Sequence, residues 1–591
     1  MELSYIRFHQ SNRKGKCVME LSRRDVVKLF AGSIPAYYAG NVLLRAADNS
    51  PALPPAPTPI PAPPGFGVAE GPFQPTWESL AANYQVPDWY RDAKFGIWAH
   101  WGPQCQPEMG DWYAQKMYQF STNPNSDYQF HCKTYGHPSK FGFKDVINEW
   151  KADKWEPEKL LALYKKAGAK FFAAMANHHD NLDMWDSTYQ PWNSVAVGPK
   201  KNIIGGWAKA TREAGLKFAI SCHASHTWDW MQVAQDSDPS GEYAGIPYDG
   251  RVSKADGKGK WWDGLDPQDL YAQYHQKGNY GWNLSPQANG GRGRRGSQQT
   301  PPPPVDPAYI EKFFNRTIDL IQKYQPDLLY FDDTVLPIYP ASDIGLRIAA
   351  YLYNTSFTKN GKLEAVMTGK GLNAQQRQAI LYDVERGVTT GGETIPWQTD
   401  TCIGDWHYRR SLFEQHRYKT PLQVVQMLID IVSKNGNLML SIPVRGNGTI
   451  DEDEVACVES IGKWMGPNGE GIYATRPWKV YGEGPSTVAS NQARGQFGGS
   501  RDVRGYTPED FRFTTKGDTV YAFMMGWPDS GNATIKSLAQ NSENFPREIA
   551  KVELLGFGPL TFTRDMAGLI VNLPENKPND IAYTLKITPK A

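Results

Sequence analysis

The feature that most constrains this fold is a repeated alternation of short apolar runs and amphipathic segments between residues 77 and 473. Residues 205–214 and 307–324 show helical spacing, and each is closely followed by an apolar run that is typical of a buried strand. Repeated strand–helix units predict a parallel sheet with right-handed crossovers. A doubly wound sheet is the alternative, but no Gly-x-Gly-x-x-Gly follows a strand in the context that a dinucleotide site needs. We therefore predict a TIM-like (β/α) barrel at residues 77–477, with loop insertions that account for its length.

The remaining C-terminal residues follow a different pattern. Short β-type runs separated by turns occur at residues 519–525, 551–555 and 583–587. Several short strands at close spacing predict an antiparallel β-sandwich. We place it at residues 478–591 and expect it to brace the barrel.

The N-terminal segment has the pattern of an export signal. Arg23 and Arg24 lie in a Ser-Arg-Arg-Asp-Val-Val-Lys-Leu-Phe segment of the twin-arginine type, and the apolar stretch after it is too short and broken for a transmembrane helix. Residues 1–47 are thus a predicted signal segment, which predicts a periplasmic or secreted protein with no membrane span in the mature chain. Residues 48–76 are a predicted Pro-rich linker. Met-Glu-Leu-Ser recurs at Met19, so translation could also begin there.

Composition narrows the class of partner. The chain of 591 residues has a formal net charge of +1, which gives no reason to expect nucleic acid or an anionic membrane as partner. It contains 20 Trp and 30 Tyr, and many of the Trp lie near His and Asp in the sequence. Sugar rings have apolar faces and hydroxyl edges, so this combination favours a carbohydrate ligand, although large proteins also bury Trp for packing alone. None of the six Cys forms a Cys-x-x-Cys pair, and the five left after the signal are not a disulfide scaffold.

Five of the predicted strands end in polar residues of catalytic type. These residues are His100, the His178-His179-Asp180 run, His223, Asp332 and Glu385. The carboxyl ends of barrel strands share one face, where the active site of this architecture lies. The sequence therefore predicts an active site built from several strand ends.

The clearest of these endings is Leu-Leu-Tyr-Phe followed by Asp332 and Asp333. The apolar run reads as a strand that is buried on both faces. Two carboxylates directly after it are costly unless the strand opens into a cleft. The alternative is that one Asp caps the next turn or helix.

Two chemistries fit these strand ends. A metal hydrolase would use His178, His179, His223 or His226 as ligands, with a carboxylate. Adjacent side chains of an extended His178-His179 pair point to opposite sides, and no His-x-His or His-Glu-x-x-His occurs, so we predict no metal and no cofactor. Glycoside hydrolysis by two carboxylates is the second chemistry, with one as nucleophile and one as acid.

Several motifs together resemble the glycoside hydrolase family 29 α-L-fucosidases. They are Phe-Gly-Ile-Trp-Ala-His-Trp-Gly from residue 95, Asp-Trp-Tyr from residue 111, His-His-Asp from residue 178, Pro-Asp-Leu-Leu-Tyr-Phe-Asp from residue 326, Asn-Leu-Met-Leu-Ser-Ile-Pro from residue 437, Gly-Thr-Ile from residue 448 and Asn-Gly-Glu-Gly-Ile-Tyr from residue 468. The resemblance runs from about residue 89 to residue 477. It implies a TIM-like barrel with a C-terminal β-sandwich and a retaining mechanism.

The resemblance also implies roles for individual residues. The nucleophile at the end of the fourth strand matches Asp332 rather than Asp333. His100, His178 and His179 would hold fucose hydroxyls. Two aromatic residues, Trp112 and Trp406, are further candidates for the same pocket.

The acid/base residue cannot be assigned directly from the resemblance to the family. Many members have Trp-Glu where this chain has Trp397-Gln398, and glutamine cannot donate a proton to a leaving group. Glu385 ends an apolar strand, where a rigidly held acid is expected, so we predict Glu385 as the acid/base. Glu393 and Asp400 stay open as alternatives for the acid. The structural alternative for Glu385 is an ion pair with neighbouring Arg386 or with another cation.

The predicted function is therefore a retaining exo-glycosidase that hydrolyses terminal α-L-fucosyl residues of fucosylated oligosaccharides or polysaccharides. Departures from the family pattern at Asn181 and at Lys201-Asn202 leave the exact sugar open, so an α-L-galactosidase is an alternative. A non-catalytic sugar-binding protein is the alternative from another class.

Overall fold

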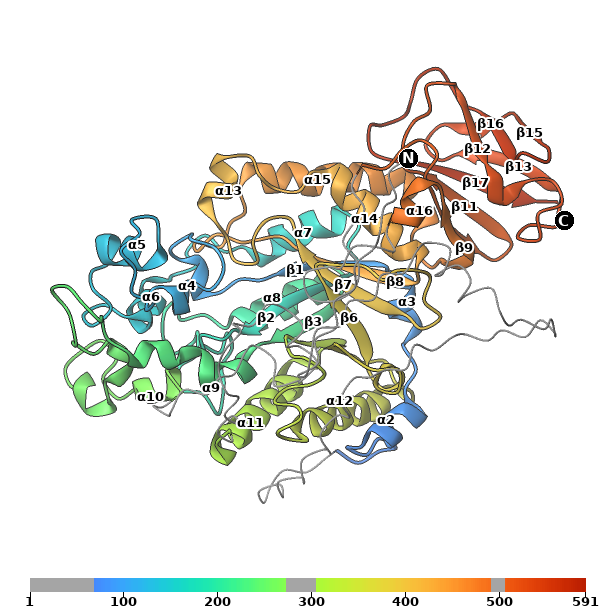
Figure 1. The fold of residues 1–591 in the computed structure, drawn as a ribbon. Helices are drawn as coiled ribbons and strands as arrows, with labels where there is room; N and C mark the ends of the chain where they lie inside the picture. Colours follow the sequence, from blue (N-terminus) through green and yellow to red (C-terminus); the bar gives the residue numbers. More distant parts are fainter. Residues whose placement is uncertain (1–68, 273–304, 490–504, 591) are drawn as a thin grey trace, which may run out of the picture. The chain divides into compact units, whose positions relative to one another are not determined.

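The computed structural model describes residues 69–272, 305–489 and 505–590 (Figure 1). The predicted signal at residues 1–47 and the predicted linker up to residue 68 lie outside the described residues.

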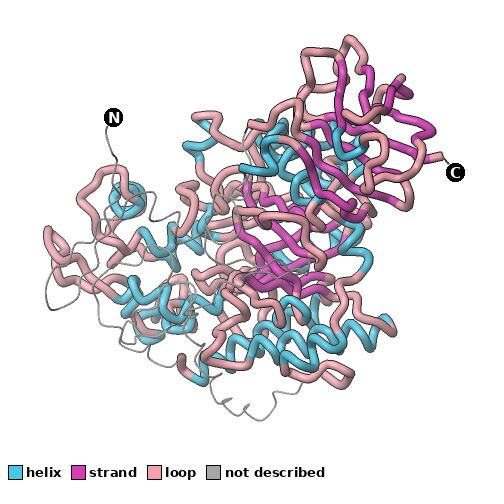
Figure 2. Tube along the Cα trace, turned by 45° about the vertical axis from the view of Figure 1, so that its right-hand side comes forward, coloured by secondary structure: helices cyan, strands magenta, loops and turns pink. Residues whose placement is uncertain are grey.

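Eight parallel strands close into a barrel in chain order, which confirms the predicted fold class (Figure 2). The last strand pairs with the first, with Phe95 opposite Leu438. The strands are β1 (Phe95–Ala99), β2 (Phe171–Asn177), β3 (Lys217–Cys222), β4 (Leu328–Phe331), β5 (Val366–Lys370), β6 (Leu381–Glu385), β7 (Trp397–Cys402) and β8 (Gly436–Ser441).

The connecting helices begin and end at clear sequence signals. Helix α11 begins after Asp306, whose side chain accepts a hydrogen bond from the Ala308 amide, and Pro307 occupies its first position. Helix α14 begins at a capping box of Thr420 and Gln423. The longer helices are α7 (Pro157–Lys166), α8 (Ile203–Glu213), α11 (Pro307–Tyr324), α12 (Ile344–Asn360), α14 (Pro421–Ser433) and α15 (Glu452–Asn468).

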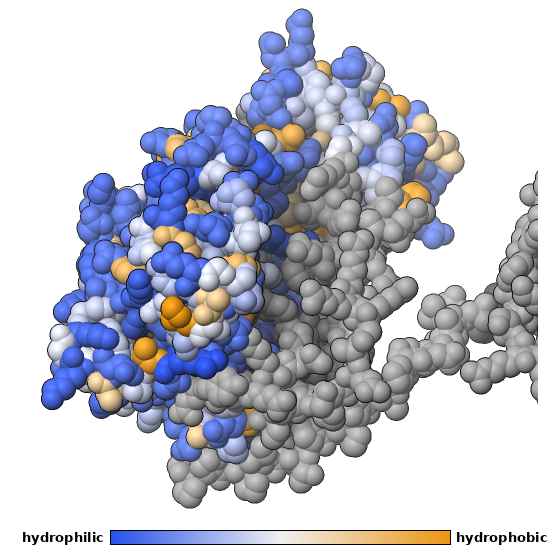
Figure 3. Space-filling view, turned by 60° about the vertical axis from the view of Figure 1, so that its left-hand side comes forward, coloured by the Kyte–Doolittle hydropathy of each residue, from blue (hydrophilic) through white to orange (hydrophobic). Residues whose placement is uncertain are grey.

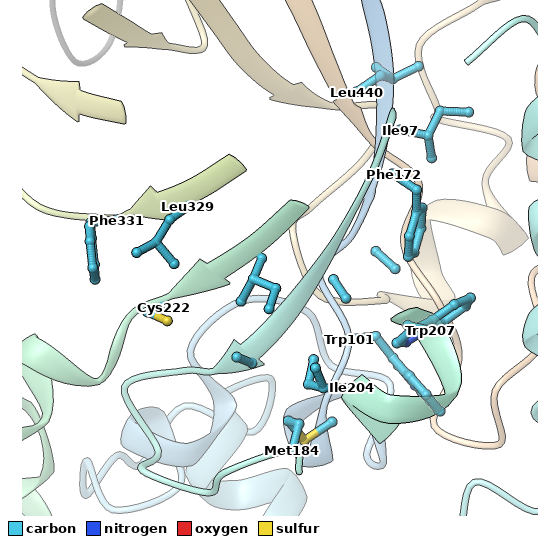
Figure 4. Packing of buried hydrophobic residues seen from close by; sticks show 14 of the residues in the cluster. Ile97, Trp101, Phe172, Met184, Ile204, Trp207, Cys222, Leu329, Phe331 and Leu440 are labelled. Carbon is cyan, nitrogen blue, oxygen red and sulfur yellow. The ribbon is translucent and has the colours of Figure 1, made fainter. Parts of the chain in front are cut away.

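Alternate residues of the barrel strands belong to two different apolar cores. Ile97, Phe172 and Leu329 belong to the larger core, which also contains helix residues such as Trp207 (Figure 4). The neighbouring positions on the same strands form a smaller cluster, which fills the barrel interior. Its members include Trp98, Phe171, Ala173, Ala219, Leu328, Tyr330, Val366, Leu381 and Met439, together with Tyr90 of helix α3 (Asp88–Ala93). Because side chains alternate along a strand, residues two positions beyond an interior side chain also face the interior.

Two barrel strands, β5 and β7, have no counterpart among the predicted strands. Strand β5 reads Val-Met-Thr-Gly-Lys, with only two apolar residues at its start. Strand β7 reads Trp-Gln-Thr-Asp-Thr-Cys, yet all six residues are buried. Both strands carry polar residues that face the barrel interior. A search for apolar runs therefore does not detect these two strands.

The C-terminal residues form two antiparallel sheets, as predicted for a β-sandwich. Their apolar core includes Phe511, Phe513, Leu569 and Leu585. One sheet has the order β14-β13-β17-β11-β10-β9 and the other β12-β16-β15. The strands are β9 (Arg476–Glu483), β10 (Phe511–Lys516), β11 (Thr519–Met524), β12 (Asn532–Ile535), β13 (Ile549–Leu554), β14 (Gly558–Leu560), β15 (Phe562–Arg564), β16 (Leu569–Asn572) and β17 (Tyr583–Pro589).

One face of the molecule is mainly polar. Figure 3 shows a face on which hydrophilic residues predominate and apolar ones are scattered. Among the described residues, no helix has both the length and the apolar character needed to cross a membrane. All five Cys in this part of the chain are free thiols.

Candidate active site

Three neighbouring strand ends bring two carboxylates to one ammonium group. Asp332 directly follows β4, while Lys370 and Glu385 are the last residues of β5 and β6. Lys370 Nζ lies 2.5 Å from Asp332 Oδ1 and 2.6 Å from Glu385 Oε2. Since one nitrogen contacts both carboxyl groups, the contacting oxygens lie within about 5 Å of each other, close enough for paired-carboxylate chemistry.

The environment drives the pKa values of the two carboxyl groups apart. Burial alone would raise the pKa of Asp332, but Lys370 and His223 together hold it well below its ordinary value. Burial raises the pKa of Glu385 to about 7; Lys370 acts against this rise, and the charges of Asp332 and Asp400 support it. The pair therefore combines an ionised group with a protonated one near neutral pH.

A cluster of imidazoles lies beside Asp332. The ring centroid of His178 lies 5.0 Å from that of His100, 4.2 Å from His179, 4.9 Å from His223 and 4.6 Å from His407. Burial is the main cause that lowers the pKa of His100, His178 and His179 well below its ordinary value. These rings are therefore neutral near pH 7, and each offers one hydrogen-bond donor and one acceptor.

Hydrogen bonds fix which ring nitrogen carries the proton in two of them. Gln104 Nε2 lies 2.8 Å from His178 Nδ1 and donates to Asp180 Oδ2 at 2.9 Å, so His178 keeps its proton on Nε2. His179 Nδ1 lies 2.9 Å from the His223 carbonyl oxygen and must donate to it, which leaves His179 Nε2 as an acceptor. That acceptor lies 3.6 Å from Asp332 Oδ2. A neighbouring donor and acceptor of this kind match the hydroxyl groups of a sugar.

Aromatic residues form another part of the site. The Trp406 ring lies 5.4 Å from Trp98 and 5.5 Å from His100. The Arg386 guanidinium lies 4.9 Å from the Trp406 ring centroid. Trp406 thus lies beside Trp98, His100 and Arg386.

Trp112 is connected to the site through its neighbour Asp111. It adopts a left-handed backbone conformation, with φ of 67°, just before the short helix α4 (Tyr113–Lys116). Lys116 Nζ lies 5.8 Å from its ring centroid. The preceding residue, Asp111, accepts a hydrogen bond from the His407 amide at 2.8 Å, and this contact connects the Trp112 loop to the site.

The three candidates for the acid have different surroundings. Glu385 shares Lys370 with Asp332, whereas Glu393 pairs with Arg377 at 3.2 Å. Asp400 lies on β7 and accepts a hydrogen bond from Tyr330 at 2.6 Å. Of the three, Glu385 is the one held to Asp332 through a shared cation.

Gln398 lies one layer below Glu385 and Asp400 in the barrel, because it pairs with Asp383 while Asp400 pairs with Glu385. Its amide nitrogen donates to Asp383 Oδ1 at 2.8 Å, and its amide oxygen accepts from the Tyr90 hydroxyl at 2.7 Å. This glutamine is therefore part of the interior polar network, below the layer that contains Glu385.

Sequence reasoning did not identify Lys370 or His407 as site residues. Lys370 ends a strand that was not predicted. His407 directly follows Trp406, and this adjacency was a usable signal. His223, predicted as a polar strand ending and as a possible metal ligand, lies 3.3 Å from Asp332 Oδ2 through its Nδ1.

Within residues 69–272, 305–489 and 505–590, two groups of three imidazoles have the spacing of a possible metal site. They are His100, His178 and His407, and His178, His179 and His223, with ligand atoms within 4.8 Å of one another. His178 belongs to both groups, yet its Nδ1 is engaged by Gln104 and its Nε2 carries the proton. Metal ligation through His178 Nε2 would require the proton to move to Nδ1, which Gln104 occupies as a donor. The hydrogen bonds of the cluster therefore suit sugar hydroxyl groups better than a metal ion.

Family models match most of the chain. The model described as Alpha-L-fucosidase matches residues 66–470, and the model described as Alpha-L-fucosidase C-terminal domain matches residues 506–588. The two matches correspond to the barrel and to the antiparallel sheets.

Curated relatives extend over nearly the same length. Tissue alpha-L-fucosidase of Rattus norvegicus is 24% identical over 539 residues, which cover 88% of this chain and 94% of that protein. Plasma alpha-L-fucosidase of Homo sapiens is 24% identical over 523 residues, covering 85% of this chain and 89% of the relative.

Solved structures share the fold. A Thermotoga maritima alpha-fucosidase in complex with a mechanism-based inhibitor has a TM-score of 0.61 and 23% identity, and the match covers 87% of this chain and 99% of that one. A trapped covalent intermediate of a Bacteroides thetaiotaomicron GH29 alpha-L-fucosidase has a TM-score of 0.54 and 16% identity, with coverage of 90% and 100%. The barrel, its C-terminal sheets and the family match over residues 66–470 lead to one conclusion: this chain belongs to the α-L-fucosidase family.

Proposed function

We propose that the protein is a retaining exo-α-L-fucosidase that releases terminal α-L-fucosyl residues from fucosylated oligosaccharides or polysaccharides. The observation that carries the proposal is the Lys370 ammonium between Asp332 and Glu385. Retaining glycosidases hold their two carboxyl groups about 5–5.5 Å apart, whereas inverting enzymes leave room for a water molecule between carboxylate and sugar. The shared contact favours the shorter separation.

The reaction has two steps. Asp332 attacks the anomeric carbon while Glu385 protonates the glycosidic oxygen, so that the aglycone leaves as an alcohol and the sugar forms an ester with Asp332. Glu385, now ionised, takes a proton from water, and the resulting hydroxyl attacks the anomeric carbon and frees Asp332. Two displacements at the same carbon retain the anomeric configuration.

The surrounding residues give the pocket its specificity in this proposal. His100, His178 and His179 are at most 3% exposed and would hold the hydroxyls of one sugar ring. Below them the barrel is filled by the small apolar cluster around Ala173 and Leu328. A barrel that is filled below these imidazoles offers no path for a continuing glycan chain, which supports cleavage of a terminal residue. We further propose, from the predicted signal, that the protein acts in the periplasm or after secretion.

Covalent labelling tests the nucleophile. Incubation with 2-fluoro-fucosyl fluoride should add one 2-fluorofucosyl group, located on Asp332 by peptide mass spectrometry, since the fluorine slows hydrolysis of the ester. Asp332→Ala should abolish turnover of an aryl α-L-fucoside and regain activity with azide. Asp333→Asn is the matched control, because Ser225 and His226 surround this carboxylate, and the label should remain on Asp332.

Three outcomes would contradict the retaining mechanism through Asp332, and two others would contradict the fucosidase activity. A label on another residue, near-normal turnover by Asp332→Ala, or a product of inverted configuration by NMR would each exclude Asp332 as the nucleophile of a retaining enzyme. Binding of fucose without turnover would indicate a sugar-binding protein. A higher kcat/KM on the α-L-galactoside than on the α-L-fucoside would indicate a galactosidase.

A further inference from the structure

Glu385 has two carboxyl neighbours inside the barrel. Strands β6 and β7 pair in parallel, with Glu385 opposite Asp400 and Asp383 opposite Gln398. Paired residues of neighbouring strands, and residues two apart on one strand, project to the same face of a sheet. Glu385, Asp383 and Asp400 therefore all face the barrel interior, where Asp383 is 1% exposed and Asp400 is fully buried.

Asp400 is fixed by a contact that crosses the barrel. Its Oδ2 accepts a hydrogen bond of 2.6 Å from the hydroxyl of Tyr330. Tyr330 lies on β4, and strands β5 and β6 separate β4 from β7, so this bond spans the interior. Among the described residues, Asp400 Oδ1 has no hydrogen-bond partner, and the same holds for Asp383 Oδ2.

Few cations balance the carboxyl groups around Glu385. Asp332 and Tyr330 face Glu385 from the β4 side, and Lys370 faces it from β5. Asp383 lies on the same strand as Glu385, Asp400 lies on β7, and Arg386 is the next residue in the chain. The ammonium of Lys370 contacts both Asp332 and Glu385. Arg386 instead lies over Trp406 and 3.7 Å from Asp111.

This imbalance requires that protons remain bound inside the site. Buried carboxylates without a compensating cation are costly, so carboxyl groups in such a cluster keep their protons. Burial and then Asp400 raise the pKa of Asp383 well above its ordinary value. Asp383 is thereby protonated, and Asp332 and Asp400 are the neighbouring carboxyl groups that act to raise the pKa of Glu385.

We propose that Asp400 is a positioning residue for the acid/base: its carboxylate, held by Tyr330 on the strand beside Glu385, keeps the proton on Glu385 until the leaving group accepts it. Asp332 is consumed in the covalent intermediate, whereas Asp400 forms no bond to the sugar in either step. Asp400 acts through Glu385 and makes no contact with the sugar in this proposal. The inference rests on the proposed function, because it concerns the acid of that reaction.

The pH profile of Asp400→Asn tests the inference. Asparagine keeps the size and the hydrogen-bond acceptor for Tyr330 but lacks the charge, so the alkaline limb of kcat/KM should move to lower pH by about one unit, a typical effect of one nearby charge. At pH 7 the activity on a fucoside with a poor leaving group should fall about fivefold for a one-unit shift, because the protonated fraction of Glu385 falls from about one half to about one tenth. An activated aryl fucoside, which needs little protonation, should lose much less.

Two further variants keep the test decisive. Asp319→Asn removes a buried carboxylate of helix α11, which is bound to Trp185 and Thr188, and should leave the alkaline limb in place. Tyr330→Phe removes the hydrogen bond to Asp400 and should move the limb in the same direction as Asp400→Asn, but by less. It serves as the second probe if Asp400→Asn does not fold, which a thermal unfolding scan would reveal.

The outcomes separate this inference from the proposed function. If the wild type hydrolyses aryl fucosides but the limb of Asp400→Asn stays in place, or both substrates lose activity equally, the inference is wrong and the proposed function stands. If Asp400→Asn abolishes the alkaline limb together with all activity on poor leaving groups, Asp400 itself is the acid. If the wild type turns over no fucoside, the proposed function has failed.

Discussion

At the scale of single residues, Lys370 controls the charge of both catalytic carboxyl groups. It contacts Asp332 and Glu385 at 2.5 and 2.6 Å. Burial alone would lower the pKa of the lysine, but these two carboxyl groups raise it well above its ordinary value. An ammonium in this position favours the ionised form of each carboxyl group. The nucleophile benefits from this effect, whereas the acid keeps its proton through burial and through its other neighbours.

Replacing Lys370 should therefore change the pH profile as well as the rate. In Lys370→Met the pKa values of both carboxyl groups rise, so the acidic limb of kcat/KM, set by ionisation of Asp332, and the alkaline limb, set by loss of the Glu385 proton, should both move to higher pH. We expect kcat/KM to fall at least about 100-fold, as for loss of a charged group in an active site. Lys370→Arg, which keeps the positive charge, is the matched control and should retain more activity. A lower rate with both limbs unmoved would contradict this role.

The pKa of Glu385 predicts the alkaline limb of the pH profile. Its pKa of about 7 means that the acid is protonated below pH 7 and loses its proton as the pH rises above it, so kcat/KM should decline through an alkaline limb near pH 7. Glu385→Gln should remove this limb. The variant should lose most activity on poor leaving groups and less on activated aryl fucosides; equal losses on both would favour Glu393 or Asp400 as the acid.

At the scale of elements, the accuracy of the sequence-based predictions depended on where polar residues sit. Strand β4 was predicted with its observed bounds, because Leu328–Phe331 is apolar on both faces and its abrupt end marks Asp332. Strand β5 was missed because Thr-Gly-Lys follows two apolar residues, and with it Lys370 was missed. Strand β7 was missed because Gln398 and Asp400 bind partners inside the barrel, and no local pattern shows which buried polar residues find such partners.

The close packing between β1 and β2 predicts how a substitution at Gly96 changes the stability of the protein. A Cβ atom on Gly96 would lie 2.3 Å from the Phe171 ring, so Gly96→Ala requires this ring and its neighbours in the barrel to shift. Overpacking of this kind costs about 1–3 kcal/mol of unfolding free energy, measurable by urea denaturation. Gly391→Ala is the control, because a Cβ there meets nothing within 4 Å, and its unfolding free energy should change by less than about 0.5 kcal/mol. Equal effects of the two changes would show that the β1–β2 contact is looser than the structure indicates.

At the scale of the whole molecule, one buried carboxylate connects the barrel to the C-terminal sheets. Asp430 of α14 accepts hydrogen bonds from Arg512 of β10 at 2.5 Å and from Lys434 at 2.8 Å. The three side chains are at most 2% exposed. Burial alone would raise the pKa of Asp430, but Lys434 and Arg512 hold it below the ordinary value of 3.8.

Asp430→Asn should therefore weaken the whole described fold. The change leaves two buried cations without a carboxylate, which costs about 3–5 kcal/mol in unfolding free energy. Asp518→Asn is the matched control, because Asp518 forms an exposed ion pair with Arg547 and should cost less than about 1 kcal/mol. Since the folded-state pKa of Asp430 is depressed, its contribution is present above pH 3.8 and is lost as the pH falls through the folded-state value. The difference in stability between wild type and Asp430→Asn should thus shrink in acid, and a difference that stays constant or grows below pH 3.8 would contradict the ion-pair origin of this stability.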